Sequence, residues 1–166
     1  SQRRYACEQA WLDSGLPVQI LRLPGIYGPG RSVLDSLRAG KARRILKADQ
    51  VFCRIHVDDI AGACLHLMHQ AAAGPGPAIV NVSDDCPAAP QDLLKYGADL
   101  LSCELPNEEL FELASRSMSA MARSFWSENR RVRNTLLCQQ LGYVLLHPDF
   151  KAGLQDCLRE EAQSLS

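Results

Sequence analysis

The sequence predicts an α/β protein with parallel strands and a mostly helical C-terminal third. Short β-type runs alternate with helical patterns in the earlier part of the chain, which is the order of elements found in proteins with parallel sheets. The later residues are helical in character. We therefore expect a sheet covered by helices, with the C-terminal third lying against it as a cap.

The first part of the chain combines strand-like runs with a stiff loop and two helices. Gly15 ends the first helical pattern, and the apolar run after it has the length of a core strand. Ser32 is expected to cap the second helix, which Gly40 ends. The expected elements are a helix over 2–14, a strand over 18–23, a loop over 24–31, a helix over 33–39, and strands over 42–47 and 50–57.

A longer helix opens the second part, with Asp58 or Asp59 as its expected cap. Its apolar face is formed by Ile60, Cys64, Leu67 and Met68. Pro90 suits the first position of a later helix, because its missing N–H would be unpaired there in any case. The expected elements are a helix from 58 or 59 to about 70, a linker over 71–77, a strand over 78–82, a helix over 91–101, and helical segments over 107–121, 127–133, 134–140 and 149–162.

Composition limits the class of partner and the compartment. The chain has 166 residues and a formal net charge of -1, so its bulk charge gives no reason to expect a nucleic acid or an anionic membrane as partner. No apolar run approaches the roughly 20 residues that a membrane span needs. The seven cysteines are widely spaced and form no C-x-x-C pair. We interpret them as reduced thiols, predict no metal site, and expect a cytoplasmic protein.

The loop over 24–31 is the first candidate ligand site. Pro24 and Pro29 fix its backbone, and its glycines permit a positive φ or the close approach of a ligand. It presents one aromatic ring, Tyr27, and one cation, Arg31. A constrained loop at the end of a strand is where α/β proteins bind ligands. The alternative is a plain connection between a strand and a helix.

A second candidate segment runs from Arg54 to Ile60. Because side chains alternate along a strand, Arg54 and His56 are expected on one face, opposite Ile55 and Val57. Arg54 suits a phosphate or carboxylate ligand, with a surface ion pair as the alternative. His56 is interpreted as a hydrogen-bonded structural residue, with a catalytic role left open.

Two further polar clusters have ordinary explanations. The basic residues within 127–134 fit a solvated helix face, and the alternative is a guanidinium fork for an anionic substrate. Asp84 and Asp85 fit a turn and are weak evidence for a metal. The only cluster of glycines, over 74–76, does not follow a strand and is not a dinucleotide-binding fingerprint.

Three segments in order resemble the C-terminal half of extended or atypical short-chain dehydrogenase/reductases, the NAD-dependent epimerase/dehydratase-like proteins. They are Leu23–Arg31, Arg54–Ala61 and Val80–Asp85. The closing segment Leu141–Leu154 resembles the tail of that family. The likeness covers nearly the whole chain, and the order of the segments makes it specific for the superfamily rather than for one reaction.

The resemblance implies a partial Rossmann-type, doubly wound sheet with a smaller, mostly helical portion of the substrate domain. It implies NAD or NADP as cofactor, with Pro24, Gly25 and Ile26 near the nicotinamide. It also implies that Tyr27, Arg31 and Arg54 face the substrate. In the family most cofactor contacts belong to the N-terminal half, so residues 1–166 are expected to be the C-terminal part of the domain, with the cofactor-binding half absent.

This chain departs from the family at the position of the catalytic Tyr-x-x-x-Lys pair. Aligned on Ala6–Gln9, its Lys falls on Arg4 and its Tyr falls before Ser1. Arg4 is therefore the catalytic candidate, although an arginine does not give up its proton.

Two functions follow from the resemblance. One is an NAD(P)-dependent oxidoreductase, epimerase or dehydratase that acts on a small polar or nucleotide-linked substrate by hydride transfer. The other is a non-catalytic dinucleotide-binding or scaffold protein that has lost the Tyr-Lys pair. The expected partner is a small molecule rather than a nucleic acid or a membrane. A homodimer and import into an organelle are left open.

Overall fold

The computed structural model describes residues 2–129 and 131–164. These residues contain helices and short parallel strands, which confirms the expected α/β class. The helices are α1 (Gln2–Leu12), α2 (Val33–Arg38), α3 (Val57–Ala73), α4 (Pro90–Leu101), α5 (Phe111–Ser117), α6 (Ala120–Trp126), the π-helical turn η1 (Leu136–Gln140) and α7 (Phe150–Ser164). The strands are β1 (Ile20–Arg22), β2 (Gly25–Tyr27), β3 (Arg44–Leu46), β4 (Arg54–His56), β5 (Ile79–Asn81) and β6 (Glu108–Leu110).

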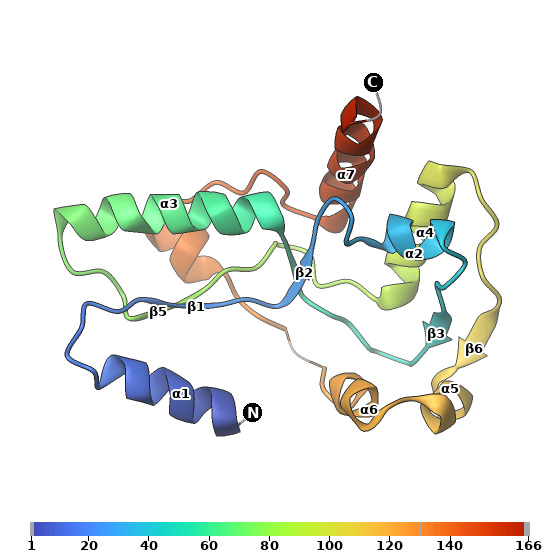
Figure 1. Cartoon of the computed structure of the whole chain (residues 1–166), viewed down its shortest axis with the longest axis horizontal. Coiled ribbons are helices and arrows are strands. Elements are labelled where there is room, and N and C mark those ends of the chain that lie inside the picture. The colour runs from blue at the N-terminus through green and yellow to red at the C-terminus, as the bar shows by residue number, and fades with distance from the viewer. Residues whose placement is uncertain (1, 130, 165–166) are drawn as a thin grey trace.

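The described strands pair in twos, all in parallel: β1 with β5, β2 with β4, and β3 with β6. The first two pairs are linked by the chain that continues β5. Its backbone donates from Val82 to the carbonyl of Arg22 and from Asp84 to the carbonyl of Arg54. Residues 79–84 therefore run first beside β1 and then beside β4, and this brings the ends of four strands to the middle of the molecule (Figure 1).

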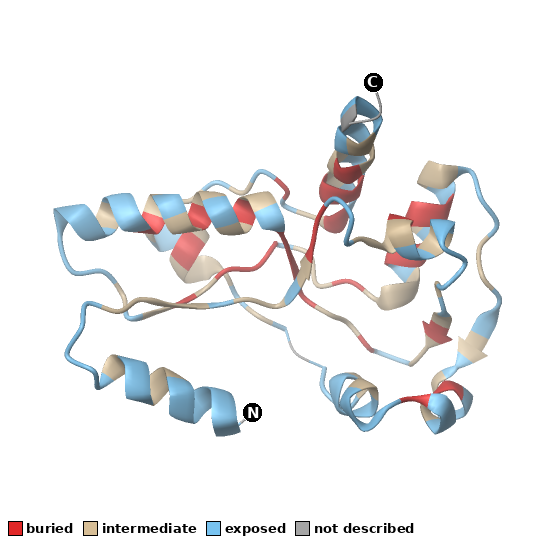
Figure 2. Cartoon of the chain, in the orientation of Figure 1, coloured by how far each residue is buried: buried red, intermediate tan, exposed pale blue. Residues whose placement is uncertain are grey.

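Apolar side chains form separate clusters on the two sides of these strands. One cluster joins β4, β5, α3 and η1 around the fully buried Ile55 and Leu137. A second joins β2, α2, α4 and α7 around Tyr27, Leu34 and Leu154. Figure 2 shows the buried residues on the inner side of α3 and at the base of α7. The C-terminal helix thus lies against the strands, as expected of the cap.

None of the described residues of the first helix is buried. Tyr5 and Trp11 are exposed. An ion pair between Glu8 and Arg22 connects α1 to β1, and the hydrogen bond from Arg22 lowers the pKa of the Glu8 carboxyl. Most apolar positions of this helix are therefore exposed, and Leu12 is partly buried.

Two local expectations about the site region are wrong. The loop over 24–31 contains a strand, β2, because Gly25–Tyr27 pairs with Arg54–His56. The cap of α3 is His56, whose Nδ1 accepts from the backbone N–H of Asp58, rather than Asp58 or Asp59. An imidazole nitrogen at this position satisfies one of the unpaired donors of the first turn.

Expectations about the later segments also need correction. Residues 107–121 begin with a strand, β6, because Glu108–Leu110 pairs with β3 and Glu109 forms an ion pair with Arg43. The described residues over 127–133 are not helical, and Arg130 of the basic cluster lies outside the described part of the chain. On α3, Met68 is exposed, whereas Asp59, Ala63 and Leu67 are buried.

Removing a core side chain under α7 tests this packing. Leu34→Ala is expected to lower the free energy of unfolding by about 2–5 kcal/mol, because Leu34 is fully buried in this cluster and its removal leaves a cavity. The matched variant Leu113→Ala, at an exposed position of α5, is expected to change it by less than about 0.5 kcal/mol. Urea unfolding measures both, and equal effects would contradict the described packing.

Candidate functional site

The pairing of β2 with β4 brings two distant segments together. Its register sets Gly25 opposite Arg54 and Tyr27 opposite His56. Because side chains alternate along strands, Tyr27, Arg54 and His56 are placed on one face, and Ile55 faces the opposite cluster. The two candidate segments of the sequence therefore lie side by side.

A cavity of about 200 Å³ lies on this face and is named here the Tyr27 cavity. It is lined by Gly25, Ile26, Tyr27, Arg31, Ser32, Val33, Arg54, Leu93 and Leu154. Five of the seven residues predicted for cofactor, substrate or catalysis are among them. Pro24 precedes the cavity in the chain without lining it, and Arg4 is an exposed residue of α1 that does not line it either. The binding roles of these residues remain predictions.

Arg54 is buried rather than engaged in a surface ion pair. Its Nη1 donates to the carbonyls of Phe52 at 2.8 Å and Ala88 at 3.1 Å. Burial lowers the pKa of the guanidinium, and the carboxylate of Asp84 opposes that change. An arginine stays protonated even so. The cavity therefore has a fixed positive charge in its wall and a second, exposed cation, Arg31, at its edge.

Asp84 is the other charged group behind this wall, and it is almost fully buried. Its Oδ1 accepts from the backbone N–H of Cys86, and this hydrogen bond closes the turn expected from the sequence. Its Oδ2 has no partner among the described residues. Burial raises the pKa of this carboxyl to about 7, although nearby Arg54 acts in the opposite direction. Asp84 can therefore change its charge near neutral pH beside the cavity.

The phenol of Tyr27 is held between three elements. Its Oη donates to the carbonyl of Asp149 at 3.5 Å, and its ring meets His56 edge-on, with 5.1 Å between the centroids. A Cβ on Gly153 would overlap the phenol, so only glycine leaves room at that position of α7. Burial raises the pKa of Tyr27 well above its usual range. The side chain is therefore a neutral hydrogen-bond donor at physiological pH.

His56 resembles the centre of a thiol–imidazole–carboxylate triad. Its Nε2 lies 3.5 Å from Sγ of Cys157, and its Nδ1 lies 3.4 Å from a carboxylate oxygen of Asp58. Cys157 is fully buried, however, and burial raises the pKa of its thiol to about 12. Because the thiolate is the nucleophilic form, the arrangement supports a hydrogen-bonded structural role for His56.

The structure adds two residues that the sequence analysis did not assign to this region. Asp59 is fully buried and accepts from the backbone N–H groups of Leu146 and His147 and from Nδ1 of His147. The remaining ring nitrogen of His147 lies 2.8 Å from Asp156 on α7. One signal was present in the sequence: Asp59 lies at helical spacing from Ala63 and Leu67, so it falls on the buried face of α3.

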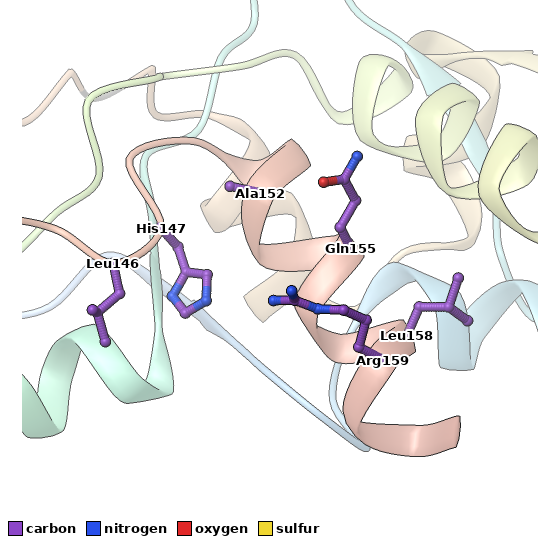
Figure 3. Close-up of a pocket in the computed structure, with 6 residues that line it drawn as sticks. All are labelled: Leu146, His147, Ala152, Gln155, Leu158 and Arg159. Atoms are coloured by element: carbon purple, nitrogen blue, oxygen red, sulfur yellow. The ribbon is translucent and has the colours of Figure 1, made fainter. Parts of the chain in front are cut away.

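A larger, open cavity of about 430 Å³ lies beside α7. Figure 3 shows its lining residues, with Leu146 and His147 on the loop before the helix and the others on α7 itself. Arg131 and Arg133, which belong to the described part of the basic cluster, line neither cavity.

Solved structures similar to this chain share its fold over most of its length. A functionally unknown conserved protein from Silicibacter pomeroyi is 44% identical, with a TM-score of 0.83, and 92% of this chain covers 53% of that one. Human epimerase family protein SDR39U1 with NADPH is 19% identical, with a TM-score of 0.67 and coverages of 84% and 47%. A dTDP-glucose 4,6-dehydratase from Bacillus anthracis in complex with NAD is 15% identical, with a TM-score of 0.68 and coverages of 96% and 49%.

The chain has the fold of the epimerase/dehydratase-like short-chain dehydrogenase/reductases. This confirms at the level of fold the family resemblance read from the sequence. The chain spans about half the length of the solved structures that it matches. No protein-family model and no curated protein matches the sequence. None of the helices in the described part of the chain is long and apolar enough to cross a membrane.

The raised pKa of Asp84 predicts a specific pH dependence of stability. A carboxyl whose folded-state pKa is raised stabilises the fold while protonated, and this contribution is lost as the pH rises from about 4 to about 7. Asp84→Asn removes the titration, so its stability relative to the parent is expected to increase over that range by at most about 4 kcal/mol. Urea unfolding at a series of pH values measures the difference.

The neighbouring variant Asp85→Asn serves as the control, because Asp85 is exposed and its carboxylate accepts a hydrogen bond from Asn134. It should retain the pH dependence of the parent. A parent and an Asp84→Asn variant whose stabilities differ by a constant amount across the range would show that Asp84 does not titrate as described.

Proposed function

We propose that residues 1–166 are the C-terminal, substrate-side part of an NAD(P)-dependent oxidoreductase, epimerase or dehydratase. The cofactor-binding half is then encoded outside this chain. The substrate is a small polar or nucleotide-linked molecule, and the reaction is hydride transfer at a carbinol carbon. One observation carries the proposal: Gly25, Tyr27, Arg31 and Arg54 line a single cavity at the end of paired strands.

The residues present fit the nicotinamide end of such a cofactor and not its phosphates. Gly25 and Ile26 offer an exposed strand edge at the mouth of the cavity, where a Cβ on Gly25 would press on the carbonyl of Cys53. A glycine-rich turn that opens a helix is what binds a pyrophosphate. The glycines over 74–76 instead follow the C-terminal end of α3, with Gly74 as its C-cap. The cofactor, when bound, supplies the hydride acceptor.

The chain's own groups perform the polar part of recognition. Arg31 and Arg54 attract and orient an anionic substrate, one from the rim and one from the wall of the cavity. Tyr27 stays protonated, because burial raises its pKa, and its O–H donates to the carbonyl of Asp149, so its neutral ring forms part of the cavity wall. NAD and NADPH are bound in the Bacillus anthracis and human structures respectively, which supports a dinucleotide for this protein as well.

A second function, a dinucleotide-binding or scaffold protein without turnover, is favoured by Arg4. This residue takes the place of the family lysine and lies on an exposed helix away from the Tyr27 cavity. The two functions differ in their readout: the enzyme oxidises or reduces a substrate, whereas the scaffold binds NAD(P) without consuming it. A homodimer and a cytoplasmic location belong to the proposal in either case.

Arg31→Ala in the protein that joins this chain to its cofactor-binding half tests the proposed substrate site. UDP-, dTDP- and GDP-linked sugars serve as probes, and NAD(P)H absorbance follows turnover. We expect the KM for an accepted anionic substrate to rise about ten- to a hundredfold, because one charge-assisted contact is lost. Arg31 is exposed, so the fold should survive the change.

Arg116→Ala, at an exposed position of α5, is the control and should leave the KM unchanged. An unchanged KM in Arg31→Ala for every accepted anionic substrate would contradict the proposed site. Binding of NAD(P)H with no turnover of any probe would favour the scaffold function.

A further inference from the structure

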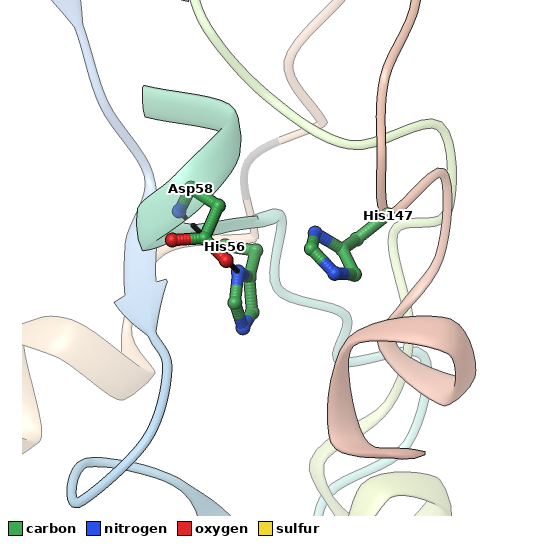
Figure 4. Close-up of side chains that lie close together, drawn as sticks. All are labelled: His56, Asp58 and His147. Atoms are coloured by element: carbon green, nitrogen blue, oxygen red, sulfur yellow. Dashed lines mark hydrogen bonds and ion pairs between the residues drawn. The ribbon is translucent and has the colours of Figure 1, made fainter. Parts of the chain in front are cut away.

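Two histidines and a carboxylate meet beside the Tyr27 cavity without belonging to it. His56 ends β4, Asp58 lies in the first turn of α3, and His147 lies on the loop before α7 (Figure 4). One ligand atom of each lies within 4.8 Å of the others. Both histidines are buried, whereas the side chain of Asp58 is 44% exposed. An ion could therefore reach the cluster from solvent.

A second group of carboxylates shares Asp58 with the first. Asp58, Asp156 and Glu160 also lie with their oxygens within 4.8 Å of one another. Asp156 and Glu160 are one helical turn apart on α7, and Asp156 lies 2.8 Å from Nε2 of His147. The two groups together draw ligand atoms from β4, α3, α7 and the loop before α7. Arg159 forms an ion pair with Asp156 of this cluster.

The chemistry of these donors suits a transition metal. Imidazole and carboxylate together favour zinc and related divalent ions, whereas magnesium and calcium prefer oxygen alone. Neutral imidazole is the ligating form of histidine, and both rings of the cluster are buried. Sγ of Cys157 lies 3.5 Å from Nε2 of His56 but belongs to neither group of converging ligand atoms.

A further carboxylate holds His147 in the manner seen at metal sites. Ligating histidines usually donate their other ring N–H to a carboxylate or carbonyl that fixes the ring. Asp59, fully buried, lies 3.0 Å from Nδ1 of His147 and also accepts from its backbone N–H. Nε2 of His147 is thereby directed at the carboxylates of the cluster.

We propose that His56, Asp58 and His147 bind a divalent transition-metal ion of the zinc class, with Asp156 and Glu160 supplying further carboxylate ligands. The ion joins the first turn of α3 to α7 as a structural clip, so this inference is independent of the proposed oxidoreductase function. When the ion binds, it takes the place of the direct contact between His147 and Asp156. The lone pair of His56 that binds the ion is then no longer available to accept from the backbone N–H of Asp58. His147 also lines the open cavity beside α7, which gives an ion a path from solvent.

Calorimetric titration of the 166-residue chain with zinc chloride tests this site. The exposed thiols Cys7 and Cys103 are changed to serine in every sample, because they could bind zinc themselves. We expect one site of micromolar or tighter affinity, weakened at least about tenfold by Asp58→Asn, with much weaker binding of magnesium. Zinc should also raise the unfolding temperature of the parent and not that of Asp58→Asn.

Two matched variants serve as controls. Asp92→Asn changes the equivalent exposed carboxylate in the first turn of α4, and His69→Asn removes an exposed histidine of α3. Both should bind zinc like the parent. Absence of a micromolar site in the parent, equal affinity in Asp58→Asn, or loss of binding in His69→Asn would each overturn the proposal.

Discussion

A buried carboxylate, that of Asp59, is the constraint on which the C-terminal part of the structure depends. It receives the backbone N–H groups of Leu146 and His147, a ring nitrogen of His147 and the hydroxyl of Tyr143. A carboxylate taken out of water is costly unless its oxygens are satisfied in this way. The desolvation cost of burying the Asp59 carboxylate is offset only when the loop over 143–147 is in place. The loop therefore has one position relative to α3.

The position of that loop determines where α7 begins, and α7 closes the Tyr27 cavity. Leu154 and Cys157 pack on Tyr27 and His56 from this helix, and Gly153 gives the phenol the space it needs. The opposite wall comes from the pairing of β2 with β4. The cavity therefore combines a strand pair of the nucleotide-cofactor fold with a helix fixed by one buried anion, and both parts are needed to set Arg54 and Tyr27 beside each other.

Local sequence signals predicted most elements and much of this site. Ser32 and Pro90 marked helix starts that the structure confirms, and the family-like segments placed Tyr27, Arg31 and Arg54 together. What could not be predicted depends on distant contacts. The strands β2 and β6 are three residues long and exist because partners far along the chain pair with them. The role of Asp59 was likewise hidden, because an acidic residue in the first turn of a helix usually acts as a cap.

The thermodynamic coupling between Asp59 and His147 tests the central claim most directly. Urea unfolding of Asp59→Asn, His147→Gln and the double variant, with EDTA present to remove metal ions, completes a double-mutant cycle. If the buried carboxylate anchors the loop through His147, each single change is destabilising and the coupling energy is about 1–3 kcal/mol. Effects that add to within about 0.5 kcal/mol would show that the two side chains act independently and would contradict the account.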